Sequence, residues 1–284
     1  MTGLELTVGV VGGGRMGSGI AVAFLTAGHS VVVAEVSPVA AAAAGERIRA
    51  GLTKALERGA TTQTLPALLG RLRVVDDLGE LPPAADLVIE AVPELAAAKR
   101  AVLSAVERVV PETCVIATNT SSLSVTELAQ ALAQPGRFLG LHFFNPVPSS
   151  ALVEIVVAPT TDERVLARAS AWVEQLGKQS VAVRDSPGFA TSRLGVLLGL
   201  EAIRMLEEGV ADAAAIDRAM ELGYRHPTGP LRSTDLVGLD VRLAIAEHLS
   251  ETLGDRFTPP ALLRDMVARG ELGRKTGKGF YAWP

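Results

Sequence analysis

Two ionisable side chains in this sequence lie inside apolar runs, where a polar residue is costly. His142 follows Leu141 and precedes two phenylalanines, and Glu154 lies in the run of residues 152–156. A histidine in such surroundings is most often a satisfied core or surface residue, but beside a cofactor it becomes a candidate general base. A buried carboxylate is costly unless it is paired, and His142 is a natural partner for Glu154. Together the two could accept and hold a proton.

A second group of polar residues follows an expected strand. Residues 119–122 read Asn-Thr-Ser-Ser and come directly after the apolar run 115–118. His142 and Asn145 come after the next expected strand, residues 138–141. In open α/β sheets, ligands bind outside the carboxyl ends of the strands. Both polar segments are therefore candidates for one ligand site.

Residues 12–17 read Gly-Gly-Gly-Arg-Met-Gly and fit the dinucleotide pattern G-x-G-x-x-G. Gly12 permits the tight turn, Gly14 lets the backbone approach a pyrophosphate, and Gly17 lets helix and strand pack closely. The helix that follows presents free N–H groups to the phosphates. Arg15 could face the pyrophosphate or solvent, and Met16, which begins the apolar stripe of the helix, is also expected at the cofactor. The pattern alone is weak, but a strand before it and a helix after it strengthen it.

An acid at the end of the second expected strand indicates which dinucleotide binds. Glu35 follows Gly17 by about the spacing at which an acid accepts the adenosine ribose hydroxyls. Its charge would repel a 2′-phosphate, and no arginine follows in residues 36–38. We therefore expect NAD rather than NADP. The competing interpretation, a solvated acid at a strand end, is less favoured beside the glycine pattern.

The elements that must position these residues alternate along the first part of the chain. Such alternation predicts a parallel, doubly wound sheet of the Rossmann type. Beyond Asp185 and Ser186 only helical patterns remain, so we expect an α/β NAD-binding domain at 1–185 and an all-helical substrate and dimerisation domain at 186–284. The expected strands are 6–11, 30–35, 72–75, 87–90, 115–118, 138–141, 152–157 and 180–183. The expected helices are 16–27, 38–59, 95–110, 165–176, 192–208, 212–222, 231–248 and 261–268.

Composition narrows the class of protein. Hydrophobic residues make up 48% and charged residues 20% of the 284 residues, and the net charge is −4. The sequence contains no basic run, so we expect neither nucleic acid nor an anionic membrane as partner. No apolar stretch reaches the length of a bilayer span. We also expect no bound metal. The single cysteine, Cys114, excludes a disulfide framework within the chain. The N-terminal residues 1–5 lack a positively charged region, so we expect no signal peptide and a cytoplasmic protein.

At this point the sequence resembles the L-3-hydroxyacyl-CoA dehydrogenase family over nearly its whole length. The histidine segment and the C-terminal segment are the most specific matches, and their order along the chain makes chance agreement negligible. The matching segments are 12–20, 88–94, 118–124, 140–148, 152–155, 185–189 and 273–281.

The resemblance implies an NAD-dependent oxidoreductase of the EC 1.1.1 class that acts on the 3-hydroxyl of a short-chain 3-hydroxyacyl-CoA in fatty acid metabolism. It makes His142 the general base and Glu154 the acid that orients the imidazole. Ser121 would bind the 3-oxygen, and Asn145 would also contact substrate.

The same resemblance assigns residues that bind the cofactor and the rest of the substrate. It places Glu90, Glu94 and Lys99 near the nicotinamide half of NAD. Asn119 is also expected to bind the cofactor. In the family, the long second helix binds the CoA phosphates, and here that region carries Lys54 and Arg58, for which a solvated helix face is an equal alternative. The helical domain would form a homodimer and close over the acyl chain.

One position departs from the family pattern. After Pro187-Gly188-Phe189 the family carries an active-site asparagine that points at the substrate carbonyl oxygens, and this chain has Ser192. Loss of a donor to a developing oxyanion can cost about 10²–10³ in rate. Ser192 could act through water, the activity could be weak, or the substrate could differ. We prefer a different substrate, either a hydroxyacyl group on an acyl carrier protein or a small polar hydroxy acid.

Two further hypotheses about the function compete with a 3-hydroxyacyl-CoA dehydrogenase. The β-hydroxyacid dehydrogenases share the glycine opening and a helical second domain, but they use a catalytic lysine that the helix 192–208 lacks. A cofactor-binding structural protein, like the crystallins derived from this fold, would retain NAD binding without turnover. The presence of Ser121, His142 and Glu154 disfavours it.

Overall fold

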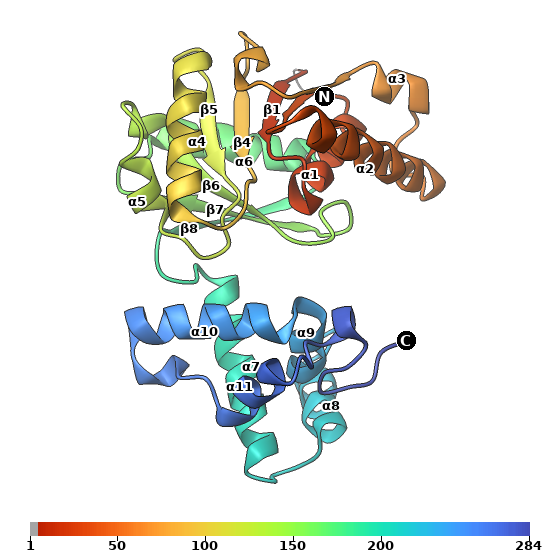
Figure 1. Ribbon diagram of the computed structural model, residues 1–284, viewed down its shortest axis with the longest axis vertical. Helices are drawn as coiled ribbons and strands as arrows, with labels where there is room; N and C mark the ends of the chain where they lie inside the picture. Colours follow the sequence, from red (N-terminus) through yellow and green to blue (C-terminus); the bar gives the residue numbers. More distant parts are fainter. Residues whose placement is uncertain (1–4) are drawn as a thin grey trace. The chain divides into compact units, whose positions relative to one another are not determined.

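The computed structural model describes residues 5–284, so most of the N-terminal segment from which we expected no signal peptide lies outside the described residues. The chain divides into two compact units, Met1–Asp185 and Ser186–Pro284 (Figure 1). Each unit has its own hydrophobic core. Within the described residues, no helix is both long enough and apolar enough to cross a membrane.

The first unit is built on an eight-stranded sheet with the order β3-β2-β1-β4-β5-β6-β7-β8. The order of its first six strands is that of the doubly wound dinucleotide-binding fold, so the predicted fold class is confirmed. The strands are β1 (Thr7–Val11), β2 (Ser30–Ala34), β3 (Leu72–Val75), β4 (Leu87–Glu90), β5 (Val115–Thr118), β6 (Phe138–Phe143), β7 (Leu152–Val157) and β8 (Gln179–Arg184).

Helices cover both faces of this sheet, and in Figure 1 α4 lies in front of it and α6 behind it. Every residue of β4, β5 and β6 is buried, as a sheet covered on both faces requires. Two short helices, α3 and α5, were not predicted. The α-helices of this unit are α1 (Arg15–Thr26), α2 (Pro38–Glu57), α3 (Leu65–Leu69), α4 (Ala96–Val109), α5 (Val125–Ala129) and α6 (Glu163–Gln175).

The expectation of an entirely parallel sheet is wrong at one pair of strands. β6 and β7 run antiparallel, whereas all other neighbours are parallel. A parallel neighbour needs a crossover of a dozen or more residues, and the connection 144–151 is too short for one. The reversal pairs His142 directly opposite Glu154. The strand register itself therefore brings the two ionisable side chains together.

Helices are the regular elements of the second unit among its described residues, and isolated bridges lie near the C-terminus. The single helix expected at 231–248 is wrong, because the chain forms two helices separated at Gly238. That residue has φ +108, a conformation that favours glycine and ends α9. The helices are α7 (Thr191–Glu207), α8 (Ala213–Gly223), α9 (Pro230–Val237), α10 (Leu239–Leu253) and α11 (Ala261–Ala268).

Two buried aspartates fasten the C-terminal segment to this helical core. Asp235 of α9 accepts hydrogen bonds from the backbone N–H groups of Phe280 and Tyr281 and from the indole N–H of Trp283, at 2.8–2.9 Å. Asp217 of α8 accepts one from the Tyr281 hydroxyl at 2.7 Å. The end of the segment that matched the family so specifically, Phe280 and Tyr281, is therefore held against the core of this unit.

Candidate active site

The His142–Glu154 pair lies at the antiparallel junction of β6 and β7. His142 Nδ1 lies 2.9 Å from Glu154 Oε2, and the two residues are 6% and 0% exposed. A proton on Nδ1 makes this bond, which leaves Nε2 as the basic nitrogen of the neutral ring. The Phe144 ring packs against the imidazole with 4.3 Å between ring centroids. The histidine is thus held by a hydrogen bond on one side and an aromatic ring on another.

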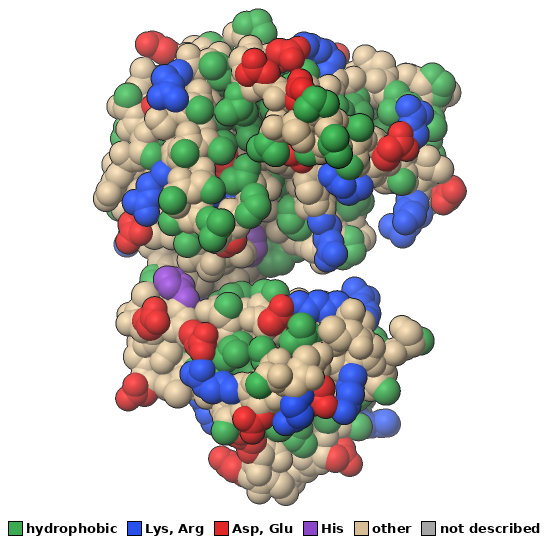
Figure 2. All heavy atoms as spheres, viewed as in Figure 1, with side chains coloured by type: hydrophobic (Ala, Val, Ile, Leu, Met, Phe, Trp, Pro, Cys, Tyr) green, Lys and Arg blue, Asp and Glu red, His purple; other side chains and the backbone are tan. Residues whose placement is uncertain are grey.

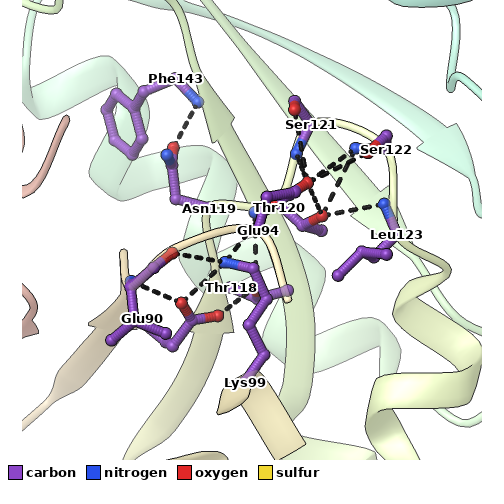
Figure 3. Close-up of polar contacts among 11 residues, drawn as sticks. Glu90, Glu94, Lys99, Thr118, Asn119, Thr120, Ser121, Ser122, Leu123 and Phe143 are labelled. Atoms are coloured by element: carbon purple, nitrogen blue, oxygen red, sulfur yellow. Dashed lines mark hydrogen bonds and ion pairs between the residues drawn. The ribbon is translucent and has the colours of Figure 1, made fainter. Parts of the chain in front are cut away.

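A loop after β5 carries Ser121, and Glu94 organises it. One oxygen of Glu94, Oε1, accepts hydrogen bonds from Thr120 Oγ1 at 2.5 Å and from the N–H groups of Ser121 and Ser122 at 2.8 and 3.1 Å (Figure 3). Burial alone would raise the pKa of Glu94, but the charge of Lys99 and these hydrogen bonds lower it below its usual value. Glu94 therefore remains a charged anchor for the loop.

Lys99 of α4 joins this anchor to the end of β4. Its ammonium group lies 2.8 Å from Glu90 Oε1 and 3.3 Å from Glu94 Oε2, and its side chain is 1% exposed. The other oxygen of Glu90 accepts a hydrogen bond from Thr118 Oγ1 at 2.7 Å. Figure 3 shows the lysine between the two carboxylates. Such an enclosed ammonium group positions the surrounding loops, and a direct contact of Glu90, Glu94 or Lys99 with NAD stays a prediction.

Asn119 also stabilises the site, through a buried hydrogen bond to the backbone. Its side-chain oxygen accepts a hydrogen bond from the Phe143 N–H at 2.9 Å, which ties the end of β5 to the end of β6 (Figure 3). Asn145 is exposed on the loop that follows.

Sequence reasoning missed Lys178, whose buried ammonium group donates to the carbonyls of Val147 and Ser150 at 2.7 and 2.6 Å. An isolated lysine before a strand gave no signal of this role.

The glycine loop has the shape that a dinucleotide requires. Gly12 has φ +92, and a Cβ on Gly17 would lie 1.8 Å from the Gly12 carbonyl oxygen. A Cβ on Gly14 would meet nothing within 4 Å, so the loop is open on the side where a pyrophosphate would approach. Gly14 also caps α1 without a side-chain hydrogen bond, which leaves the first-turn N–H groups to a ligand. These features fit NAD.

The other residues of the glycine pattern 12–17 differ in their exposure to solvent. Arg15 is exposed, and Met16 packs against the core of the first unit. Gly13, which the pattern treats as variable, is also constrained, because a Cβ there would lie 2.5 Å from that of Ala44 in α2. Helix α2 therefore packs directly on the loop.

Glu35 lies at the end of β2 as expected. Its Oε1 accepts a hydrogen bond from Gly13 N–H at 2.7 Å, so the acid touches the glycine loop. The carbonyl of the same residue is also held, because Arg47 of α2 donates to it from Nε and Nη2 at 3.0 and 2.8 Å. Arg47 was missed, because only the packing of α2 brings it to the loop.

The remaining candidate residues lie on other elements. Lys54 and Arg58 are exposed at the end of α2. Ser192 is half-buried in the first turn of α7, in the second unit. The structure thus groups the predicted residues into the His142–Glu154 pair, a serine loop and a glycine loop, all within the first unit, and a serine in the second.

Comparison with known proteins decides the family. Residues 7–186 match the model of the 3-hydroxyacyl-CoA dehydrogenase NAD-binding domain, and residues 188–283 match that of the C-terminal domain of the same family. The chain belongs to the 3-hydroxyacyl-CoA dehydrogenase family. The matches cover both units, so the β-hydroxyacid dehydrogenase alternative is set aside. NAD as cofactor and an acyl-CoA as substrate follow from this membership.

Individual relatives agree along their whole length. The 3-hydroxybutyryl-CoA dehydrogenase of Mycobacterium tuberculosis is 44% identical over 280 residues, which covers 97% of this chain and 98% of the relative. A crystal structure of a (S)-3-hydroxybutyryl-CoA dehydrogenase from Ralstonia eutropha is similar with a TM-score of 0.93 and 39% identity, covering 99% of this chain and all of that one. A probable 3-hydroxybutyryl-CoA dehydrogenase of Bacillus subtilis is 42% identical over 274 residues, 96% of this chain and 95% of the relative.

Proposed function

We propose that this enzyme oxidises the L-3-hydroxyl of a short-chain acyl-CoA, with 3-hydroxybutyryl-CoA as the reference substrate. The observation that carries the proposal is the 2.9 Å contact between His142 Nδ1 and Glu154, which fixes the imidazole with Nε2 as its basic nitrogen. The names of the relatives from Mycobacterium tuberculosis and Ralstonia eutropha support the chain length.

In this reaction His142 is the residue that moves the proton. Nε2 accepts the proton of the 3-hydroxyl as the carbon–oxygen double bond forms at C3. NAD, when bound, accepts the hydride that leaves C3. The imidazolium that results is stabilised by the Glu154 carboxylate, which is fully buried and therefore interacts strongly with it. Ser121, held by Glu94, donates a hydrogen bond to the 3-oxygen.

Reduction of acetoacetyl-CoA, followed by loss of NADH absorbance, tests the proposal. His142→Gln should lower kcat by about 10²–10⁴-fold, the usual contribution of a positioned acid or base. NADH binding, measured by fluorescence titration on the same variant, should be unchanged and serves as the control. Full turnover by His142→Gln would remove the proton-transfer role.

The thioester carrier is tested separately. We propose CoA, supported by the family and by exposed Lys54 and Arg58 at the end of α2. Replacing both with alanine should raise KM for acetoacetyl-CoA but not for acetoacetyl-pantetheine, which lacks the nucleotide. Arg49→Ala, an exposed position on the same helix, is the matched control. A strong preference for the same acyl group on a carrier protein would contradict CoA.

We also propose that the chain forms a homodimer through its helical unit. Leu194, Leu222 and Tyr224 are 67%, 70% and 75% exposed, an unusual apolar load for so small a unit. Figure 2 shows hydrophobic side chains on the visible face of this unit. Light scattering should give the mass of a dimer, and Leu222→Glu with Tyr224→Glu should shift it toward the monomer. A monomer at micromolar wild-type concentration would contradict the proposal.

A further inference from the structure

One carbonyl group of the glycine loop accepts three hydrogen bonds. Arg47 of α2 donates to the Gly13 oxygen from Nε at 3.0 Å and from Nη2 at 2.8 Å, and Ser18 of α1 donates to it from Oγ at 2.7 Å. The Gly13 N–H is also held, by the Glu35 carboxylate. A backbone carbonyl has two lone pairs, so the arginine and the serine together saturate this oxygen. The loop is thus restrained from two different helices.

The restraint acts where the backbone would otherwise rotate with little resistance. The peptide group that carries this carbonyl joins Gly13 to Gly14, and neither residue has a Cβ to limit its conformation. In a trans peptide group the C=O and the N–H point in opposite directions. Holding the carbonyl toward Arg47 and Ser18 therefore turns the Gly14 N–H away from both side chains.

The direction of this peptide group matters for an anionic ligand. Helix α2 blocks the loop on its own side, because a Cβ on Gly13 would lie 2.5 Å from that of Ala44, whereas a Cβ on Gly14 would meet nothing within 4 Å. A rotated peptide group would turn the partial negative charge of its oxygen away from α2 and toward the open part of the loop. A pyrophosphate is itself negative and binds to N–H groups, so the rotated loop would repel it.

Stability alone explains the position of Arg47 less well. The residue is exposed on α2, and Ser18 already satisfies the Gly13 carbonyl from a buried position. A hydrogen bond from an exposed side chain to an oxygen that is already paired adds little to the free energy of unfolding. It does restrict the orientation of the peptide group, which lowers the cost of ordering the loop when a ligand binds.

We propose that Arg47 is a positioning residue for the cofactor, which holds the Gly13–Gly14 peptide group in the orientation that the pyrophosphate of NAD requires. Arg47 acts through the backbone of the glycine loop and not through contact with the reacting atoms. Its effect on affinity should therefore depend on the pyrophosphate of the ligand, and not on the adenosine or on the acyl group of the substrate.

Ligand binding in the absence of substrate tests the proposal. Arg47→Met should raise the Kd of ADP-ribose and of NADH by about 5- to 10-fold, because the loop must then be ordered on binding. The inhibition constant of adenosine, which has no pyrophosphate, should not change. In acetoacetyl-CoA reduction the variant should raise KM for NADH and leave kcat as it is. Arg49→Met is the control, since it removes an equal charge from the opposite face of α2, and it should bind ADP-ribose as the wild type does.

A double variant separates positioning of the loop from simple attraction by charge. Arg47 and Ser18 restrain the same carbonyl, so each compensates in part for the loss of the other. Arg47→Met combined with Ser18→Ala should therefore weaken ADP-ribose binding by more than the product of the two single losses. The Tm of unliganded Arg47→Met should stay close to that of the wild type, because the side chain is exposed.

Four results would overturn the proposal. The first is an unchanged Kd of ADP-ribose in Arg47→Met, and the second is an equal weakening of adenosine, which would place the effect at the other end of the ligand. The third is an equal loss in Arg49→Met, which would assign the effect to charge alone. The fourth is a double variant whose loss is only the product of the two single losses, since the two side chains would then act independently.

Discussion

The two units of this enzyme balance their buried charges in different ways. In the first unit, carboxylates of the candidate site are paired with basic groups, with Lys99 between Glu90 and Glu94 and His142 beside Glu154. In the second unit, Asp217 and Asp235 are 3% and 1% exposed, yet neither forms an ion pair with a cation of the described chain. Their charge is spread over N–H and O–H donors instead.

The difference separates carboxylates that can take part in a reaction from carboxylates that stabilise the fold. A carboxylate that faces a histidine or a lysine can stabilise a charge that appears during a reaction or hold a loop around it. A carboxylate surrounded by backbone N–H groups fixes the path of the chain, as Asp235 does for the C-terminal segment.

The largest loss of stability should come from removing the ammonium group of Lys99 in the first unit. Lys99→Met leaves two carboxylates without their shared partner, and the loss of one member of a buried pair costs about 3–5 kcal/mol. Urea unfolding should show this loss in the free energy of unfolding. Lys275→Met breaks an exposed ion pair with Asp240 and should cost less than about 1 kcal/mol. Equal losses in the two variants would contradict the distinction between paired interior and surface charges.

A smaller loss of stability is expected when Asp235, the carboxylate held by N–H donors, is replaced. Asp235→Asn keeps the shape but replaces an acceptor by an N–H₂ group that faces the N–H donors of Tyr281 and Trp283. Hydrogen bonds to charged groups contribute about 1.5–3 kcal/mol, so we expect a loss of that size in urea unfolding. A change in the emission of Trp283, with Trp283→Phe as reference, should accompany it. No destabilisation would show that the charge of Asp235 is dispensable.

A third variant tests how the anchor of the serine loop serves catalysis. Glu94→Gln retains the side-chain oxygen but weakens its attraction to Lys99 and to the N–H groups of residues 121 and 122. Slight misplacement of Ser121 should lower kcat about 10-fold with little change in the free energy of unfolding. Glu163→Gln at the start of α6 is the control. An unchanged kcat would mean that the loop keeps its position without the charge.

The smallest effect concerns a buried histidine outside the site. Burial lowers the pKa of His29 below 6.5, and its Nδ1 accepts a hydrogen bond from Leu6 N–H. The unfolded chain therefore binds more protons, so this contribution to stability is complete above pH 6.5 and is lost as the pH falls through the lower folded value. His29→Asn should flatten the decline in Tm below pH 6.5. A parallel decline in variant and wild type would show that other groups cause it.

Much of the fold could be predicted, because apolar runs and glycines mark buried parallel strands and the dinucleotide loop. The reversal of β7 could not be read from periodicity, since a buried strand looks alike in either direction. The length of the connection 144–151 was the available signal. Gly238 could likewise have indicated the break between α9 and α10, but a single glycine within an apolar helical pattern is often tolerated.

The candidate site was harder to predict at the level of contacts. The pairing of His142 with Glu154 was expected from the cost of burying a carboxylate, and the contact is present in the structure. The contacts of Arg47 and Lys178 depend on how α2 and β8 pack, which local sequence does not encode. The roles of Glu90, Glu94 and Lys99 toward the cofactor stay predictions, while their hydrogen bonds show what holds them in place.

A double-mutant cycle on His142 and Glu154 tests the central claim most directly. Acetoacetyl-CoA reduction is measured for the wild type, His142→Gln, Glu154→Gln and the variant with both changes, with NADH affinity checked for each. If the carboxylate acts only through the imidazole, the double variant should be no slower than His142→Gln alone. Losses that multiply, so that Glu154→Gln slows the reaction further in the absence of His142, would contradict the account.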